Sequence, residues 1–337
     1  MIKMTRIALA AVAVLGATTA MAQSSVTLYG RVNTTIEHQK DGGTSKNGIF
    51  NNASRFGVRG VEDLGGGLKA GFVLESGFNS DTGTGAAPGG GLTFGRQSEV
   101  NLSGGFGMVR LGNFFPESYF ASADYVSMHN HDTGSSADAL YLDPNWMGVG
   151  TASQARSGGN GSGNKVAYRT PSLGGLTVEG SVSMHERATG TNNKNGYDLA
   201  ANYNTGPLHL GAGYSYWDSN WQASLRGLYT IGQFTFGGYY QRNDEDLLGS
   251  RNNFRLSGMY AMGASEFHLN VGHANKWSKL SDSAATQYTL AYNYNLSKRT
   301  KVYAYYTRVN NGNNAAYNVS KRGDNFSSVA MGIRHNF

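Results

Sequence analysis

The chain repeats short segments in which apolar and polar residues alternate, and this alternation limits the fold more than any other feature of the sequence. The first such segment places Val26, Leu28, Val32 and Ile36 at one parity, with Arg31 among the polar residues at the other. A period of two residues is that of a β-strand with one dry face and one wet face. The alternation therefore predicts an all-β protein.

The alternating segments follow one another along the chain, and short turns rich in Gly, Asn, Asp and Ser alternate with longer loops between them. We count sixteen predicted strands, at residues 24–38, 49–62, 67–79, 92–104, 105–114, 163–171, 174–186, 195–204, 206–217, 220–231, 232–243, 252–262, 265–275, 285–296, 299–310 and 325–337. An even number of strands of about 10 residues, with short turns at one rim and longer loops at the other, is typical of a transmembrane β-barrel. The predicted fold is therefore a sixteen-stranded antiparallel transmembrane β-barrel.

No segment after the N-terminus is apolar over the roughly 20 residues that a membrane-spanning helix needs. A membrane protein without such helices must be a closed barrel, because open sheet edges leave backbone groups unsatisfied in hydrocarbon. The mean hydropathy of -0.40 fits a barrel, since lipid-facing residues occupy only every second position. The alternative is a soluble β-protein whose core uses the same 20 Tyr and 15 Phe residues.

The N-terminus has the pattern of a secretory signal. Lys3 and Arg6 precede an apolar run over residues 7–19, and Ala20-Met21-Ala22 fits a small-residue cleavage site. We predict a signal peptide at residues 1–22 and a barrel domain at residues 23–337. A membrane anchor is the alternative, but the apolar run is shorter than a spanning helix.

The charge balance gives no indication of nucleic-acid binding. Without Lys3 and Arg6, the 28 basic residues become 26 against 22 acidic ones, a net charge of +4. That excess is small and evenly spread, whereas a nucleic-acid surface is a concentrated basic patch. The chain has no Cys, so its rigidity must come from the hydrogen-bond ladders of the sheet.

The alternation is lost between Asn113 and Val149. A structureless loop of this length in a compact domain is usually either functional or a sign that the strand assignment is wrong. We expect it to fold into the barrel and to narrow a water-filled pore. Its acidic residues are Glu117, Asp124, Asp132, Asp138 and Asp143.

One segment alternates poorly. Gln97, Glu99 and Asn101 share a parity opposite to that of Arg96, so all three face outward if Arg96 faces the lumen. We expect these three polar residues to face outward, at a contact between subunits or under a covering loop.

Several segments together carry a family likeness. They are SSVTLYGRV, SRFGVRGVEDLGGGLKAGFVLESGF, GFGMVRLGN, NKVAYRTPSLGGLTVEG and the C-terminal VAMGIRHNF. In this order and spacing the mature chain resembles the general diffusion porins of Gram-negative bacteria, of the Burkholderia and Neisseria type.

The resemblance implies a homotrimer of sixteen-stranded barrels in the outer membrane, surrounded by lipid and lipopolysaccharide, with the third loop of each barrel folded into its pore. It also implies that the terminal Phe337 is read by the barrel-assembly machinery. Met331 and Ile333 share the parity of Phe337, as that signal requires, and His335 is a less apolar departure.

The resemblance also implies where the pore is narrowed. It places wall arginines at Arg31, Arg55, Arg96 and Arg169 and a wall glutamate at Glu75. Alternation independently puts Arg31, Arg55 and Glu75 on the lumen side, and it gives the same parity to four residues that could line a vestibule instead: Arg59, Arg226, Arg255 and Arg334.

The candidates on the third loop are Glu117, Asp124 and Asp132, which would face the wall arginines across the pore. The alternative role for these acids is to bond backbone amides and pin the loop. A charged constriction of this kind conducts ions and small hydrophilic solutes passively and biases which ions enter. Four wall arginines and the net charge of +4 favour anions.

Two other functions remain open from the sequence. A substrate-specific channel for anions, phosphate, sugars or dicarboxylates would share the fold. An outer-membrane barrel enzyme would need a nucleophile beside a base, and no Ser with a neighbouring His stands out at lumen parity, so we expect neither catalysis nor a cofactor. His129, His131 and Asp132 lack a further patterned ligand, so we expect no metal site there.

Overall fold

The computed structural model describes residues 24–123, 134–144, 163–185 and 194–337. The predicted signal peptide at residues 1–22 lies outside the described residues. Among the helices that are described, none has the length and apolar character needed to cross a bilayer.

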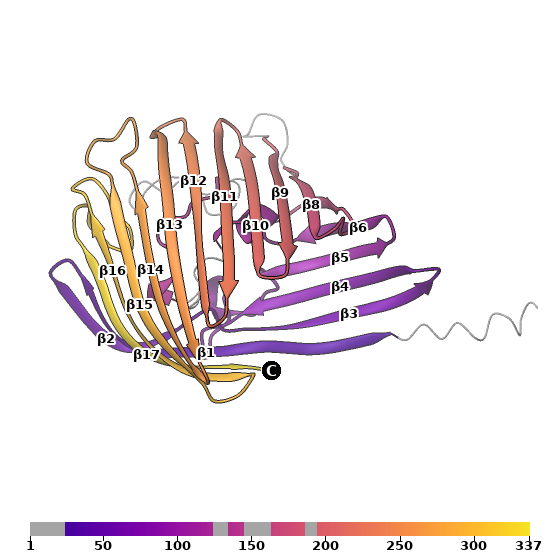
Figure 1. The fold of residues 1–337 in the computed structure, drawn as a ribbon, viewed down its shortest axis with the longest axis horizontal. Helices are drawn as coiled ribbons and strands as arrows, with labels where there is room; N and C mark the ends of the chain where they lie inside the picture. Colours follow the sequence, from indigo (N-terminus) through magenta and orange to yellow (C-terminus); the bar gives the residue numbers. More distant parts are fainter. Residues whose placement is uncertain (1–23, 124–133, 145–162, 186–193) are drawn as a thin grey trace, which may run out of the picture.

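One antiparallel sheet makes up almost the whole of the described chain, and it closes on itself because β1 pairs with both β3 and β17 (Figure 1). Its strands are β1 (Ser25–Asp41), β2 (Thr44–Asn51), β3 (Arg55–Gly65), β4 (Leu68–Gly77), β5 (Gln97–Gly104), β6 (Gly107–Asn113), β7 (Lys165–Arg169), β8 (Leu176–Ser183), β9 (Gly196–Thr205), β10 (Leu208–Trp217), β11 (Asn220–Ile231), β12 (Phe234–Glu245), β13 (Gly249–Met262), β14 (Ser265–Ala274), β15 (Ala285–Asn295), β16 (Thr300–Asn311) and β17 (Phe326–Asn336). Three short helical turns accompany them: η1 (Pro88–Gly90), α2 (Glu117–Phe120) and η2 (Gly134–Ser136).

The second barrel strand is interrupted, and β2 and β3 are its two parts. β1 pairs with β2 through its C-terminal half and with β3 through its N-terminal half. At the interruption, Asn33 receives a hydrogen bond on its backbone carbonyl from Ser54 Oγ (3.1 Å), and its side-chain amide donates to the Asn52 carbonyl (3.0 Å). Counting β2 and β3 as one strand, the described chain forms a sixteen-stranded barrel, which confirms the predicted fold.

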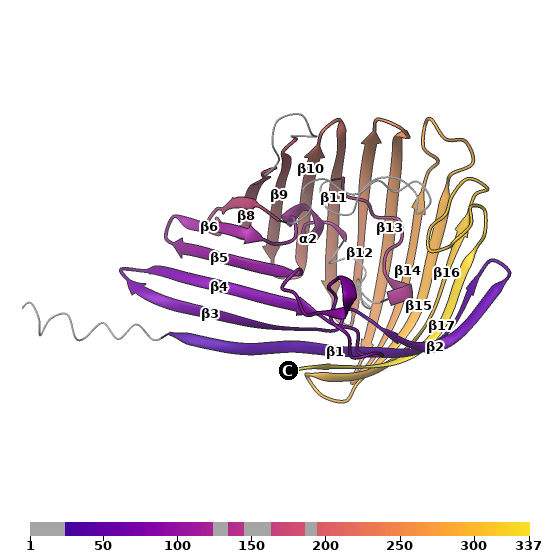
Figure 2. The same cartoon turned by 180° about the vertical axis from the view of Figure 1, so that it is seen from behind.

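The two rims of the barrel differ, as alternation and turn residues predicted. At one rim the connections are short, and those after β9, β11 and β13 have two residues each. These turns begin at Gly206, Gly232 and Gly263, whose φ angles of +52°, +57° and +60° suit glycine better than any residue with a Cβ. The other rim carries the longer connections, including the third loop between β6 and β7 (Figure 2).

The barrel is apolar outside and polar inside. Leu28, Ile36 and Leu225 are 62%, 68% and 63% exposed, whereas Asn33 and Gln287 on the inner face are fully buried. This arrangement is the reverse of a soluble β-protein, which would bury the apolar face, and it is that of a barrel surrounded by lipid. The soluble alternative therefore does not fit.

The expectation that Gln97, Glu99 and Asn101 face outward is wrong. Gln97 lies opposite the inward-facing Glu75 in the β4–β5 register, and Glu99 is buried in an ion pair with Arg110. The strand β5 begins at Gln97, five residues later than predicted from residue 92. Arg96 therefore precedes the strand, and its side chain turns inward without following the strand's parity.

The third loop folds into the barrel, as expected from its broken alternation. The turn α2 packs against β9 and β10 (Figure 2). Residues 137–142 form hydrogen bonds with the inward side chains of Gln287 and Gln241. Gly213 on β10 allows this approach, because a Cβ there would lie 2.8 Å from the Cβ of Ser118 in the loop. The described parts of the loop thus lie along the wall from β9 to β16.

Candidate functional site

One cluster of charged side chains on the inner wall centres on Glu75 of β4. Arg96 Nε donates to Glu75 Oε1 at 2.7 Å, and Arg55 Nε from β3 lies 3.7 Å from the same oxygen. The structure therefore brings together three of the residues predicted from the sequence. Arg31 is the neighbour of Arg55 on β1, where its Nη2 donates to the carbonyl of Ala53 at 3.3 Å.

A second cluster joins the wall to the third loop. Arg169 at the end of β7 donates from Nη2 to Glu117 Oε2 in α2 at 2.6 Å and from Nε to Glu179 Oε2 on β8 at 2.8 Å. Glu117 also accepts a hydrogen bond from Asn202 Nδ2 at 3.2 Å. The structure thus places a predicted wall arginine in contact with a predicted loop acid.

This second cluster includes residues that sequence reasoning did not select. Arg110 on β6 bridges Glu99 Oε2 at 2.6 Å and Glu179 Oε1 at 3.2 Å, and all three side chains are buried. The parity of Glu179 toward the lumen is visible in the sequence, but its partner is not. Asp124 and Asp132, as well as His129 and His131, lie outside the described residues.

A different loop acid, Asp138, holds the loop to the opposite wall. Its Oδ1 lies 2.6 Å from Arg255 Nη2 and accepts hydrogen bonds from the backbone N–H of Leu140 (2.9 Å) and Tyr141 (3.3 Å), while the Tyr239 hydroxyl bonds Oδ2. The side chains of Asp138 and Arg255 are 6% and 1% exposed. Arg255 therefore anchors the loop and does not line a vestibule.

The start of the loop is fixed by two more carboxylates. The backbone N–H of Ser118 donates to Asp198 Oδ1 at 3.1 Å, and its hydroxyl donates to Asp143 Oδ2 at 3.3 Å. Asp143 also accepts from Ser215 Oγ of β10 at 2.8 Å. The start of the loop is thus pinned by Asp198 of β9 and by Asp143, neither of which was among the acids predicted for this role.

At the loop rim, Arg251 of β13 joins the third loop to two outer connections. Its Nη2 donates to the Leu140 carbonyl at 2.5 Å, and its Nη1 contacts the hydroxyl of Tyr317, which lies between β16 and β17. The guanidinium also lies 4.7 Å from the ring centroid of Trp277, which follows β14 and is fully buried. A small apolar cluster that includes Leu140, Val309 and Phe326 continues this contact.

In the ion pairs that Glu75 and Glu117 form with Arg55, Arg96 and Arg169, the arginine is more exposed than the carboxylate. The side chains of Arg55, Arg96 and Arg169 are 22%, 26% and 34% exposed. Their carboxylate partners are less exposed, at 11% for the side chain of Glu75 and 13% for that of Glu117. At these two carboxylates the guanidinium groups are therefore the more accessible charges.

The pinning contact at Asp138 has a defined pH dependence. Burial alone would raise the pKa of its carboxyl, but Arg255 and the hydrogen bonds of Tyr239 and Leu140 outweigh burial and hold that pKa below its usual value. The ionised carboxylate of Asp138 therefore stabilises the docked loop when the pH is above the unfolded-state pKa of about 3.9. This stabilisation is lost as the pH falls through the folded-state pKa, which is lower still.

We therefore expect the third loop to stay docked from neutral pH down to about pH 4 and to detach only below it. Single-channel steps recorded from pH 7 to pH 3 would show detachment as a change in step size confined to the acid end. The Asp138→Asn variant should lack this acid step, because no carboxyl remains to be protonated. A step-size change centred near pH 6 would contradict the assignment to Asp138.

Among the described residues, no three His, Cys, Asp or Glu side chains form a group that could hold a metal ion.

Comparison with known proteins places this geometry in context. The family model described as Gram-negative porin matches residues 8–314. The chain is 32% identical to outer membrane porin protein 32 of Delftia acidovorans over 99% of this chain and 100% of that protein. It is 28% identical to an outer membrane porin protein of Bordetella pertussis, over 94% and 96% of the two chains.

Solved structures agree. The anion-selective porin from Comamonas acidovorans superposes with a TM-score of 0.79 at 30% identity, covering 94% of this chain and 100% of that one. The trimer form of OmpT from Vibrio cholerae shares the fold, with a TM-score of 0.67 at 16% identity over 93% and 99% of the chains.

Proposed function

We propose, on the premise that this chain belongs to the family of Gram-negative porins, that its pore favours small anions. The protein is an outer-membrane porin through which ions and small hydrophilic solutes diffuse passively. Its relatives are channels and not enzymes. What remains to be assigned is the charge selectivity and the residues that set it.

The observation that carries the proposal is the unequal exposure within the ion pairs of Glu75 and Glu117. A passing anion meets the accessible guanidinium groups of Arg55, Arg96 and Arg169, while Glu75 and Glu117 are largely covered by these partners. Fixed charges that line a narrow aqueous path raise the local concentration of ions of opposite sign. The anion-selective porin from Comamonas acidovorans, at 30% identity, supports the same sign.

We assign the constriction to wall and loop residues together. The wall side comprises Arg31, Arg55, Arg96, Arg169 and Glu75. Glu117 supplies the loop side through its contact with Arg169, and Asp124 and Asp132 stay predictions. Opposed charges of this kind set up a transverse field, in which dipolar solutes are oriented and ions of opposite sign follow different walls.

We further propose the assembly that the family likeness implies. The barrel would be exported with a signal peptide at residues 1–22, recognised through Phe337 by the barrel-assembly machinery and assembled as a homotrimer among lipid and lipopolysaccharide. Phe337 is well placed for such a role, because its N–H and C=O bond the C=O and N–H of Gly30 at 3.0 and 3.1 Å and so complete the pairing of β17 with β1.

The test of charge selectivity is the reversal potential of the purified protein in a planar bilayer that separates two KCl concentrations. We expect a potential of the sign that marks chloride as the more permeant ion. High salt on both sides should weaken the preference, since screening shortens the reach of the wall charges. A potential of the opposite sign would overturn the proposal.

A further inference from the structure

Three aromatic side chains at the start of the third loop are only partly buried. They are Phe115, Tyr119 and Phe120, which we call the aromatic row. This part of the loop lies inside the barrel, with Ser118 buried against β10, so the open parts of the three rings face the aqueous interior (Figure 2). A ring that serves packing alone can be covered completely, as Phe114 is at 1% exposure. The aromatic row instead gives the interior a patch of apolar surface.

The rings of the aromatic row contact one another and are supported from behind. The ring centroids of Phe115 and Phe120 are 6.2 Å apart, and those of Tyr119 and Phe120 are 5.5 Å apart, both pairs edge to face. Tyr119 also packs on the buried Tyr141 at 5.6 Å, and Tyr141 packs on the buried Tyr239 of β12 at 6.1 Å. Aromatic pairs prefer this edge-to-face arrangement. The aromatic row is therefore held in place by buried rings.

Arg96 supplies a positive charge at one end of the aromatic row. Its guanidinium carbon lies 5.4 Å from the ring centroid of Phe115, and its Nε donates to Glu75 Oε1 at 2.7 Å. Among the described residues, none accepts a hydrogen bond from its Nη1 or Nη2. The side chain is 26% exposed, so these two nitrogens are available to a solute. A carboxylate binds such a pair of nitrogens through two parallel hydrogen bonds.

We propose that Arg96 and the aromatic row form a transit site for aromatic carboxylates, the small anions that carry a planar ring. The carboxylate binds Nη1 and Nη2 of Arg96, and the ring of the solute packs on the open parts of Phe115 and Phe120. This inference rests on the proposed anion preference and deepens it, because it names the anions that the same constriction favours. A pore must bind a solute weakly enough to release it, and Glu75 weakens the binding by neutralising part of the charge of Arg96.

The first experiment uses the purified wild-type protein in a planar bilayer with KCl at a fixed concentration. Benzoate, cyclohexanecarboxylate or benzylammonium is added, and the half-blocking concentration is the one at which the single-channel conductance falls to half. Benzoate and cyclohexanecarboxylate have the same charge and similar size, but only benzoate is aromatic. We expect the half-blocking concentration of benzoate to be lower by about threefold, since one aromatic pair changes an equilibrium constant by about twofold to tenfold. Benzylammonium, which has the ring but a positive charge, should block least.

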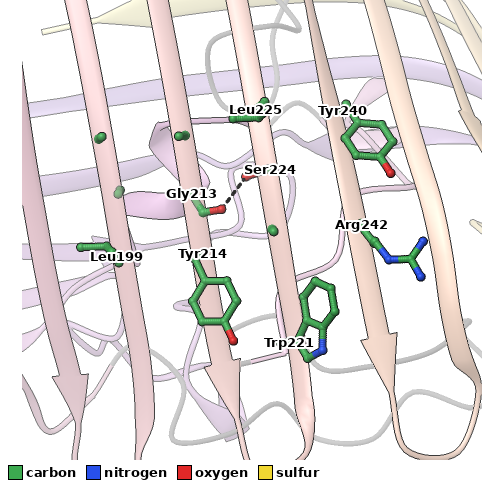
Figure 3. Close-up of a pocket in the computed structure, with 12 residues that line it drawn as sticks. Leu199, Gly213, Tyr214, Trp221, Ser224, Leu225, Tyr240 and Arg242 are labelled. Carbon is green, nitrogen blue, oxygen red and sulfur yellow. Dashed lines mark hydrogen bonds between the residues drawn. The ribbon is translucent and has the colours of Figure 1, made fainter.

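The second experiment removes the rings. In Phe115→Leu combined with Phe120→Leu, the half-blocking concentrations of benzoate and cyclohexanecarboxylate should become equal, because leucine packs on both solutes without aromatic preference. The readout is a ratio for two anions of equal charge, so a general change in pore size affects both alike. The matched control is Tyr214→Leu with Tyr240→Leu. These two rings lie on the outer wall, where they are 42% and 44% exposed (Figure 3), and their loss should leave the wild-type ratio unchanged.

Equal half-blocking concentrations of benzoate and cyclohexanecarboxylate on the wild type would overturn the inference without recourse to any variant. A wild-type ratio in the phenylalanine double variant would overturn it too, as would an equal loss of the ratio in both double variants or a block by benzylammonium as strong as that by benzoate. The reversal potential in KCl, measured without an aromatic solute, tests the proposed anion preference separately. A potassium-preferring pore that still distinguishes benzoate would overturn that preference and support the aromatic site.

Discussion

Replacing Arg96 and Arg169 together with glutamine should abolish the anion preference and shift the reversal potential toward that of a cation-preferring pore. Both guanidinium groups are among the most exposed charges of the wall clusters. Their loss would leave Arg55, at 3.7 Å, as the arginine beside Glu75 and would remove the arginine that contacts Glu117. The accessible charge at two points of the lining would therefore change from positive to negative.

The size of this effect follows from the interaction energy between a permeating ion and one charge of the wall. Two unit charges about 4 Å apart in water interact with about 1 kcal/mol, and about 1.4 kcal/mol corresponds to a tenfold ratio. Two removed charges should thus lower the ratio of chloride to potassium permeability by about tenfold after screening by salt. The measurement is the reversal potential in a KCl gradient at moderate ionic strength.

The control for this prediction removes the same number of charges from a different place. The variant Arg242→Gln with Arg308→Gln loses the same two charges from outward-facing positions on β12 and β16, and it should keep the wild-type permeability ratio. The variant Arg96→Lys with Arg169→Lys keeps the inward charge and should retain most of the preference. If the inward glutamine pair conducts with the wild-type ratio, these arginines do not set the selectivity.

The second large effect is expected from Asp138→Ala, which removes the carboxylate that holds the third loop. Arg255 is 1% exposed in its side chain, so it would remain as a buried charge without this partner. Breaking a buried ion pair from one side costs about 3–5 kcal/mol, and the backbone N–H groups of Leu140 and Tyr141 also lose their acceptor. The loop segment should detach from the wall, and single-channel conductance should rise with a broader spread of levels.

The compensating variant is Asp138→Leu combined with Arg255→Met. Replacing both members of a buried pair with apolar residues is often neutral or stabilising, so this variant should recover much of the wild-type step size. The backbone groups near Asp138 stay unsatisfied, and recovery should therefore be incomplete. An Asp138→Ala channel with wild-type steps would show that other contacts are enough to hold the loop.

The strands could be predicted from the sequence because their alternation reflects a physical boundary between lipid and water. That signal put Arg55 and Glu75 on the inner face, where the structure has them. It misled at Arg96, since a residue outside the strand is not bound by its parity. It also missed the break in the second strand, where Asn33 and Ser54 supply hydrogen bonds in place of the regular ladder.

The path of the third loop could be predicted only in outline. Lost alternation shows that a segment is not a strand, but it does not say which wall the segment meets. The family likeness placed Arg169 on the wall and Glu117 on the loop, but only the structure shows that they are in contact. The pairing of Asp138 with Arg255, which joins residues 117 positions apart, was not predicted. Such pairs depend on the closed barrel, which brings distant strands around one lumen.

The grip of Arg251 on Leu140, Trp277 and Tyr317 has a consequence for how the cell surface of such a bacterium can change. Outer connections of a barrel usually tolerate substitution, because they carry little of the fold. Trp277 and Tyr317 are exceptions, since they contact Arg251, which binds the third loop at Leu140. A bacterium that escaped phage or antibody by substituting Trp277 or Tyr317 would also weaken the attachment of the third loop that narrows its pore. Escape mutations should therefore accumulate at neighbouring positions and spare these two.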